Sequence, residues 1–385
     1  MTRQGLALYI PITANTMTQR AQDLGPFDAV LDAHATAVWA EHVLSLPLDA
    51  SVDRLIRTPM LQERIEGCEG FAARYLSKVV GVATRAFAEN DDSAKGEAHG
   101  ALFALYELQL CRPDAEGARN QHDPLLYRIR NGLEWTWLAA EHRTLAAHET
   151  GSAAQTVETI TQLCKAHRAG SHRLFDFLAG EADRFAMQRF FASDSALNIR
   201  FFDLLALSMV GSEEFTRPEI AQNLWDESGR GNRKEAHVRT FRDLLDVCGL
   251  TQARTDHIAG LSWQGRAGHN LFMMTALSRA HYWKLLGVMA VTELIDPASY
   301  EKVVHGCRRL GLAPEAYRYY SEHVEIDVVH GDGWLNNVIV PLIERTPAAV
   351  ADVVFGAQLR LASCAQYYDY LLSLLERESE SVAPA

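Results

Sequence analysis

The sequence predicts an all-α protein. Alanine, leucine, glutamate and arginine, which favour helices, dominate the chain, and the alternation of β-branched residues that marks strands is scarce. Two amphipathic stretches, 120–145 and 153–166, have the apolar spacing of helices with one buried face. With 385 residues, the chain is long enough for one large or two moderate domains with ample core.

Composition limits the partner and the compartment. Hydrophobic residues make up 48% of the chain and charged residues 22%, as in soluble globular proteins. The net charge of −12, with scattered lysine and arginine, argues against nucleic acid or an anionic membrane as partner. No apolar run reaches the ~20 residues of a membrane span, and Met1 to Ile10 make a poor signal peptide. The six cysteines are widely spaced, so we expect reduced thiols and a cytoplasmic protein.

A short polar segment divides the chain. The stretch from His148 to Ala153 contains Thr150, Gly151 and Ser152, a composition typical of linkers. We therefore expect an N-terminal helical accessory region at residues 1–150, a core domain at 151–376 and a frayed tail at 377–385.

Proline and glycine predict the helix boundaries within the core domain. Pro218 suits the first turn of a helix that begins at Arg217. Gly229 and Gly231 predict a break or kink after that helix. Further helices are expected at 238–247, at 270–294 with a stop at Asp296-Pro297, at 298–310, from 314 onward, and at 348–376.

The most informative feature is the run formed by His323, Asp327 and His330. On an α-helix, offsets of four and seven residues place the two imidazoles and the carboxylate on one stripe. Neutral imidazole and carboxylate are the donors that bind Fe(II), Mn(II) or Zn(II). Gly331 and Gly333 follow directly and cost the helix roughly 1 kcal/mol each relative to alanine, which indicates backbone crowding near a site or simply a bend.

Three further residues can complete a metal site. Glu293 lies near the end of the predicted apolar helix, where a carboxylate needs a partner unless it reaches solvent. Glu227 and His237 can converge only if the glycine-containing segment between them bends. The other interpretation of this pair is a surface loop with a solvated glutamate and an ordinary histidine. Asp226 is the alternative ligand if the helix register differs by one residue.

Together these residues form a candidate set for two metal ions. Three carboxylates and three imidazoles divide naturally into two sites, and helical bundles build di-metal carboxylate centres from inward-facing side chains. Carboxylate oxygens with imidazole suit iron or manganese better than structural zinc, which prefers a closed, cysteine-rich tetrahedron. The set is Glu227, His237, Glu293, His323, Asp327 and His330.

The order and spacing of this set resemble those of the haem-oxygenase-like diiron oxidases, often labelled iron-containing redox enzymes. The resemblance covers roughly Thr161 to Leu342, and the ligand spacing resembles that of the N-oxygenating members. Its motifs are FDLLALSMVG at 202–211, NLWDESGRG at 223–231, VTE at 291–293 before Asp296-Pro297, and EHVEIDVVH at 322–330.

The resemblance implies a haem-oxygenase-like helical bundle that binds two iron ions and no haem, with O2 as co-substrate. It implies a non-haem diiron oxygenase that N-oxygenates a small amine-containing metabolite, such as an amino acid, guanidine or aminoimidazole, in a biosynthetic pathway. The alternative within the same fold is oxidative C–C cleavage or decarboxylation of an amino acid or fatty acid. A further alternative is a non-enzymatic helical scaffold with a structural metal. No catalytic residue is expected beyond the metal ligands.

The resemblance also raises the question of a seventh ligand and of partners. Members similar to the streptozotocin-type N-oxygenase have one extra carboxylate on an earlier core helix. Asp203 is the candidate for it, with a helix-surface aspartate as the other interpretation, and Glu219 is a weaker candidate.

An external electron donor is expected. In relatives an N-terminal helical region often serves dimerisation, so residues 1–148 are expected to support a homodimer.

Overall fold

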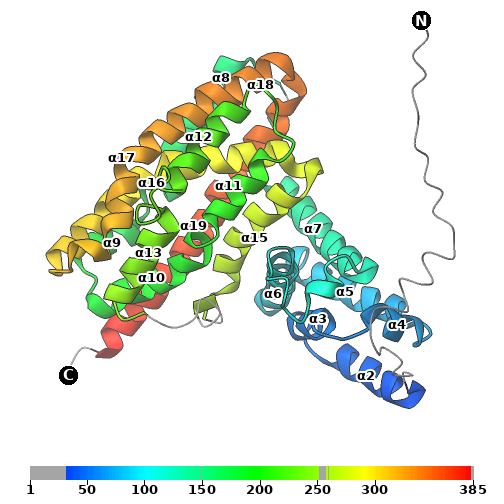
Figure 1. Ribbon diagram of the computed structural model, residues 1–385. Helices are drawn as coiled ribbons and strands as arrows, with labels where there is room; N and C mark the ends of the chain where they lie inside the picture. Colours follow the sequence, from blue (N-terminus) through cyan, green and yellow to red (C-terminus); the bar gives the residue numbers. More distant parts are fainter. Residues whose placement is uncertain (1–31, 149, 251–256, 259, 383–385) are drawn as a thin grey trace, which may run out of the picture.

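The structure, a computed structural model, describes residues 32–148, 150–250, 257–258 and 260–382, and this part of the chain contains helices and no strand. The predicted all-α fold is confirmed. Figure 1 shows a group of N-terminal helices beside a larger helical bundle. The N-terminal group comprises α2 (Ala33–Ser45), α3 (Leu48–Ile56), α4 (Leu61–Glu66), α5 (Phe71–Phe87), α6 (Asp92–Gln109) and α7 (Pro124–Thr144).

The bundle comprises the remaining helices and holds the candidate site. Helix α17 passes without a break into a π-helical turn, Trp334–Ile339, which leads into α18. The elements are α8 (Ala153–Ala166), α9 (Arg173–Gly180), α10 (Arg184–Asn198), α11 (Phe201–Met209), α12 (Arg217–Glu227), α13 (His237–Val247), α15 (Trp263–Leu277), α16 (Tyr282–Arg309), α17 (Arg318–Gly333), α18 (Val340–Arg345) and α19 (Val350–Val382).

The segment between α7 and α8 coincides with the predicted linker. Ser152 and Gln155 form a reciprocal capping box at the start of α8, which explains why the helix begins at Ala153. The division into two domains at this point remains a prediction, and residues 1–31 lie outside the described part. The predicted tail is wrong over 377–382, because α19 continues to Val382; residues 383–385 lie outside the described part.

The longest apolar segment is organised differently from the prediction. The expected helix at 270–294 is split by a turn at Arg279–His281, and α16 then continues through Pro297 to Arg309. Arg279 donates hydrogen bonds to the carbonyls of Val210 and Gly211, which ties the turn to the end of α11. A proline inside a helix lacks the N–H that its i−4 carbonyl would accept, so Pro297 leaves the carbonyl of Glu293 without its helical donor.

Helix α16 lies at the centre of the bundle and packs against α9, α17 and α19. Its crossing with α19 is close because each helix presents a glycine: a Cβ at Gly287 would overlap the carbonyl of Val353, and one at Gly356 would overlap that of Lys284. This burial on several sides stabilises α16 enough to retain Pro297 in its interior. The central position of α16 also places Glu293 in the middle of the bundle rather than at a helix end.

Helix α19 is long and apolar. By length and composition the segment Pro347–Ser379 could cross a membrane, contrary to the expectation from uninterrupted apolar runs, but 72% of its most apolar window is buried inside the protein. A buried core helix passes the same test of length and composition. The packing of α19 against α8, α15 and α16 accounts for its apolar character.

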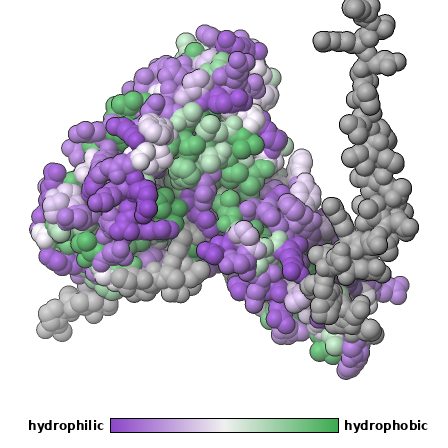
Figure 2. Space-filling view, in the orientation of Figure 1, coloured by the Kyte–Doolittle hydropathy of each residue, from purple (hydrophilic) through white to green (hydrophobic). Residues whose placement is uncertain are grey.

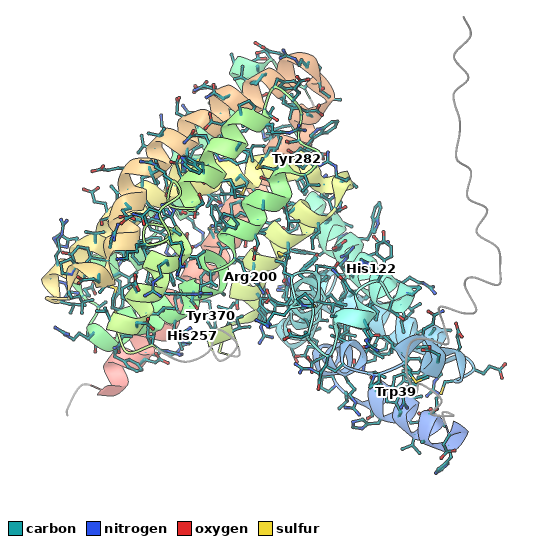
Figure 3. The ribbon with its side chains drawn as sticks, in the orientation of Figure 1. Trp39, His122, Arg200, His257, Tyr282 and Tyr370 are labelled. Atoms are coloured by element: carbon teal, nitrogen blue, oxygen red, sulfur yellow. The ribbon has the colours of Figure 1, made fainter. Side chains whose placement is uncertain are left out.

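The N-terminal helices are joined to the bundle mainly through α6 and α15. Asn270 on α15 donates a 2.9 Å hydrogen bond to the carbonyl of His99 on α6. Arg200, labelled in Figure 3, forms a 3.0 Å ion pair with Glu107 of α6. Figure 2 shows hydrophobic residues gathered on the face of the bundle over α11 and α15, beside the N-terminal helices.

Candidate metal centre

Helix α17 carries the predicted stripe. His323, Asp327 and His330 are 5%, 3% and 3% exposed, so all three side chains are buried on the inner face of the helix. The four- and three-residue steps between them keep the side chains in one line. The stripe therefore faces α12, α13 and α16 rather than solvent.

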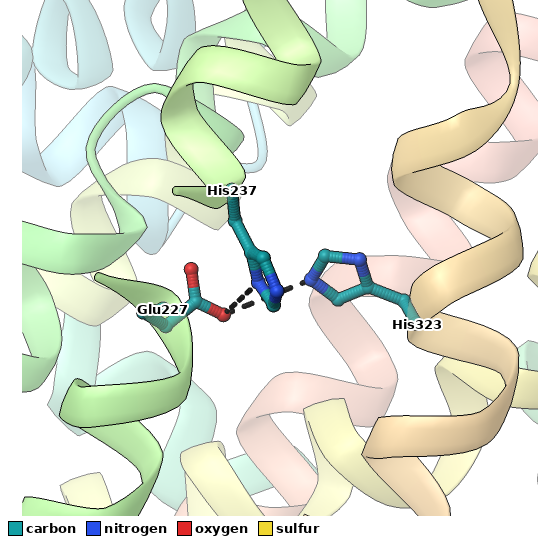
Figure 4. A group of neighbouring side chains, drawn as sticks. All are labelled: Glu227, His237 and His323. Carbon is teal, nitrogen blue, oxygen red and sulfur yellow. Dashed lines mark hydrogen bonds and ion pairs between the residues drawn. The ribbon is translucent and has the colours of Figure 1, made fainter. Parts of the chain in front are cut away.

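The first cluster contains Glu227, His237 and His323, all buried (Figure 4). Glu227 is the last residue of α12 and His237 is the first residue of α13. One Glu227 oxygen lies 2.8 Å from Nδ1 of His237 and 3.7 Å from Nε2 of His323. Three potential ligand atoms, one from each residue, lie within 4.8 Å of one another, a separation that a single metal ion can span.

The turn between α12 and α13 brings Glu227 and His237 together. Gly229 and Gly231 have φ of 73° and 84°, a region that side chains other than glycine rarely adopt. A Cβ at Gly229 would also overlap the backbone of residues 232–236. The two glycines therefore permit the tight reversal that the spacing of the pair requires.

The second cluster contains Glu293, Asp327 and His330, also all buried. Glu293 projects from the middle of α16, and its carboxylate lies 3.6 Å from Nδ1 of His330. Three potential ligand atoms of this group again lie within 4.8 Å of one another. The six residues predicted as ligands thus form two groups of three, each with imidazole and carboxylate donors.

The hydrogen bonding of His323 fits a metal ligand. Nδ1 of His323 lies 2.7 Å from the carbonyl of Tyr319, which can only accept, so Nδ1 carries the proton. Nε2 is then left with a lone pair in the neutral ring, and this buried atom has no hydrogen-bond partner. An imidazole oriented by a carbonyl at one nitrogen and free at the other is typical of metal-bound histidine.

The electrostatics of both clusters favour a cation. Burial disfavours the charge on Glu227, yet the hydrogen bond with His237 and the nearby ring of His323 lower the pKa of this carboxyl to about 2. Burial likewise disfavours charged His330, but Glu293 and Asp226 raise its pKa to about 9. Burial and the charge of Glu293 raise the pKa of Asp327 well above its ordinary value. In the metal-free protein, protons offset part of the negative charge of the buried carboxylates. A divalent ion bound there would offset this charge instead.

Asp226 points toward the second cluster but does not join either group of three. One of its oxygens lies 3.3 Å from Nε2 of His330, on the opposite side of the ring from Glu293. Arg230 and Gln222 donate hydrogen bonds to the same carboxylate and hold it in place. Asp226 therefore orients His330 so that Nδ1 faces Glu293.

Neither candidate for a seventh ligand lies in a cluster. Asp203 is 40% exposed and pairs with Arg200 at 3.1 Å, as expected of a helix-surface aspartate. Glu219 accepts hydrogen bonds from Asn223 and Asn337, at a distance from both groups along α12. The structure places Asp203 in an ion pair with Arg200 and outside both groups of three, so its role as an extra ligand remains a prediction.

A small cavity borders both clusters. It has a volume of about 40 Å³, and its wall includes Glu293, His323 and Asp327. Sequence reasoning missed three charged residues in this wall, Asp194, Asp296 and Arg360. Asp296 lies three residues after Glu293 and so shares its helix face, a signal hidden by the assumption that Pro297 ends the helix. Burial raises the pKa of Asp296 to about 7 despite the opposing charge of Arg360.

Asp194 and the surrounding tyrosines form the rest of the polar wall. Tyr320 and Asn198 each donate a 2.8 Å hydrogen bond to Asp194, and burial nevertheless raises the pKa of this carboxyl to about 6. Tyr300 and Tyr319 line the same cavity. No single feature of the α10 sequence distinguishes Asp194 from a surface aspartate.

Residues 188–364 match the sequence profile of a family described as iron-containing redox enzyme. This range contains all six clustered side chains. No curated protein matches the chain. Among solved structures, a CADD-like protein of unknown function from Nostoc punctiforme is 14% identical, and the alignment covers 58% of this chain and 98% of that chain with a TM-score of 0.47.

Proposed function

Because the chain belongs, over residues 188–364, to the iron-containing redox enzymes, we propose that it is a non-haem diiron oxygenase. It binds one iron ion at each cluster and uses O2 to oxygenate the nitrogen of a small amine-containing metabolite. The observation that carries this proposal is the pair of buried groups, each with imidazole and carboxylate donors. The negative charges of three carboxylates offset three of the four positive charges of two divalent ions, and the three imidazoles are neutral ligands. Six ligands shared by two ions leave coordination positions open.

The chain's own residues hold the ions and exclude water. Glu227, His237 and His323 would bind the first ion, and Glu293, Asp327 and His330 the second. The carbonyl of Tyr319 and the carboxylate of Asp226 orient two of the imidazoles. When bound, the two ferrous ions supply electrons for the reduction of O2, and an external donor restores them.

The cavity beside the clusters is the position for O2 and substrate. Aromatic walls from Phe190, Tyr300 and Tyr319 keep it apolar on one side, while Asp194 and Asp296 offer acceptors for a nitrogen substrate. Its volume of about 40 Å³ holds only a few water molecules, which favours a small molecule over a long acyl chain. An amine bound there lies next to Glu293 and Asp327, and so next to the second ion.

Oxidative C–C cleavage of an amino acid is the second candidate. It is favoured by the position of Asp203 and Glu219, because neither supplies the extra carboxylate associated with the streptozotocin-type N-oxygenases. The same six ligands and the same cavity serve either reaction. The products distinguish them: a hydroxylamine or nitro compound retains the carbon skeleton, whereas cleavage shortens it.

The test is anaerobic loading with Fe(II), followed by rapid mixing with O2 in the presence of a panel of amines and amino acids. We expect about two iron ions per chain, O2 consumption that depends on iron, and oxidised product from one class of substrate. His323→Ala and Glu293→Ala each remove one ligand from a different cluster. Each should lose an iron and all O2-dependent turnover while retaining the helical circular dichroism of the parent.

Asp203→Ala is the matched control, because it removes a carboxylate that lies outside both clusters. It should retain iron content and turnover. Full turnover in His323→Ala or Glu293→Ala would show that the ligand assignment is wrong. A protein that takes up zinc but neither iron nor O2 would instead be a scaffold with a structural metal.

A further inference from the structure

Arg360, on α19, is a buried cation beside the metal clusters. Its side chain is only 7% exposed, and it lines the cavity that contains Glu293, His323 and Asp327. Nε donates a 3.0 Å hydrogen bond to Thr292, the residue before Glu293. The guanidinium also lies over the ring of Phe272, 4.9 Å from its centroid. These contacts fix the side chain against α15 and α16.

The opposite charges of Asp296 and Asp194 act on Arg360 across the cavity, but neither carboxylate forms a direct ion pair with the guanidinium. Within the described residues Arg360 takes part in no ion pair, although the same part of the chain pairs many exposed arginines. A buried guanidinium without a carboxylate in direct contact is costly, because burial removes its hydration and a more distant charge replaces that hydration only in part. Arginine presents five N–H donors, and Thr292 uses one of them. The remaining N–H donors, on the terminal nitrogens, are suited to form a bidentate pair of hydrogen bonds with a carboxylate.

The position of Arg360 is that of a binding residue. It lies in the wall of two adjacent cavities, of about 40 and 60 Å³, which also share Asp194, Tyr367 and Tyr368. The first cavity reaches the metal clusters and the second extends toward α15. A ligand whose acidic end lies at Arg360 can therefore direct its other end toward Glu293 and Asp327.

We infer that Arg360 binds the carboxylate of a small amino acid substrate and orients the rest of the molecule toward the metal centre. This inference rests on the proposed function for the identity of the site as catalytic. Two acids line the same cavity as Arg360. Asp194 and Asp296 are suited to bind a cationic nitrogen. The buried cation of Arg360, the buried acid Asp296 and the half-buried acid Asp194 together match a ligand that carries both charges, and they disfavour an amine without a carboxylate.

The test measures binding to the full-length protein, both metal-free and loaded with redox-inactive Zn(II), by isothermal titration calorimetry. The probes are L-alanine, L-serine, L-lysine and L-arginine, each compared with its own carboxamide, which removes the negative charge at nearly constant size. We expect at least one acid to bind about 10-fold or more tightly than its amide. Arg360→Met should abolish that preference, and Arg360→Lys should restore part of it because the charge remains.

A thermal melt separates binding from a structural role. If Arg360 serves a ligand, Arg360→Met removes a buried charge that has no carboxylate in direct contact and should leave the midpoint nearly unchanged. A lower midpoint, with loss of binding, would assign Arg360 a structural role and overturn the inference. Arg189→Met is the control, since Arg189 is 39% exposed, pairs with Glu378 and lies outside both cavities; binding should not change.

Two further results would overturn the inference: no acid in the panel binding more tightly than its amide, or an unchanged preference in Arg360→Met. Either result can be distinguished experimentally from a failure of the proposed function. Iron-dependent O2 consumption without carboxylate preference would contradict only the role of Arg360. Carboxylate preference in a protein that holds no iron would contradict only the diiron assignment.

Discussion

At the scale of single residues, the candidate site is defined by how each imidazole is oriented. Tyr319 accepts a hydrogen bond from Nδ1 of His323, so Nε2 faces Glu227, whereas Asp226 holds Nε2 of His330, so Nδ1 faces Glu293. The two rings thus offer different nitrogens to the two clusters. These partners fix ring orientation before a metal arrives, which lowers the entropic cost of binding.

The residue scale also predicts how metal affinity depends on pH. Neighbouring carboxylates raise the pKa of His330 to about 9, so this ring holds a proton at neutral pH in the metal-free protein. A metal ion must displace this proton, so affinity should fall as pH falls below about 9, by roughly tenfold per pH unit for each proton displaced.

Competition with a chromophoric chelator for Zn(II), between pH 6.5 and 8.5, measures this dependence. Zn(II) avoids oxidation during the titration. Affinity that stays flat over this range would show that His330 is not a ligand, or that it is already deprotonated without metal.

At the scale of elements, the site depends on close approach between α12, α16 and α17. A Cβ at Gly331 would come close to the side chain of Leu294 and make ordinary contact with the backbone of Glu293, and one at Gly333 would meet the carboxylate of Glu219 on α12, a flexible side chain that can move. The close neighbours of both glycines are thus side chains, so the expected crowding of backbone against backbone is not observed. Helix α17 continues directly into the π-helical turn Trp334–Ile339. Turns of this kind occur frequently at functional sites.

At the crossing of α16 and α19, Gly287→Ala should destabilise the protein by about 1–3 kcal/mol in urea unfolding, because the added methyl group would overlap the backbone of Val353 and Ala357 and push α19 away from α16. Gly81→Ala is the matched control: Gly81 lies within α5 with open space around it, so alanine should be neutral or stabilise by about 0.5–1 kcal/mol. Equal stability of the two variants would contradict the role assigned to this crossing.

At the scale of the whole molecule, the bundle brings three carboxylates and three imidazoles into one buried region, at a cost that a bound metal would offset. Ligands that bind only the folded state stabilise it in proportion to their affinity and concentration. We therefore expect Zn(II) to raise the thermal midpoint by several degrees or more, since about 1 kcal/mol shifts the midpoint of a large domain by roughly 2–4 °C.

Differential scanning calorimetry of the parent and of Glu227→Gln measures this effect. The variant keeps the size of the side chain but removes a charge from the first cluster, so its stabilisation by Zn(II) should be smaller. An equal shift in both proteins would place the metal elsewhere.

The whole-molecule scale also concerns the N-terminal helices. They are anchored to α15 through α6, and a cavity of about 370 Å³ lies between α5, α6 and α7 on one side and α15 and α19 on the other. Their expected role in forming a homodimer remains a prediction. So do the external electron donor and the cytoplasmic location.

The sequence by itself determined the all-α fold and predicted the set of six candidate ligands, whereas their division into two groups came from the structure. A stripe such as His323, Asp327 and His330 depends only on the period of one helix, and the reversal from Glu227 to His237 depends only on two glycines between them. Such features are local, so they can be predicted without knowing which helices pack together.

Only the tertiary structure decided which other charged residues matter. Asp203 and Asp194 both look like surface aspartates in sequence, yet Asp203 pairs with Arg200 near the N-terminal helices and half-buried Asp194 lines the cavity beside the clusters. Pro297 was expected to end a helix that packing instead preserves. The role proposed for Arg360 follows from its position in the wall of the cavity between α10, α16 and α19. Burial and counter-charge depend on neighbours from distant parts of the chain, and no local period encodes them.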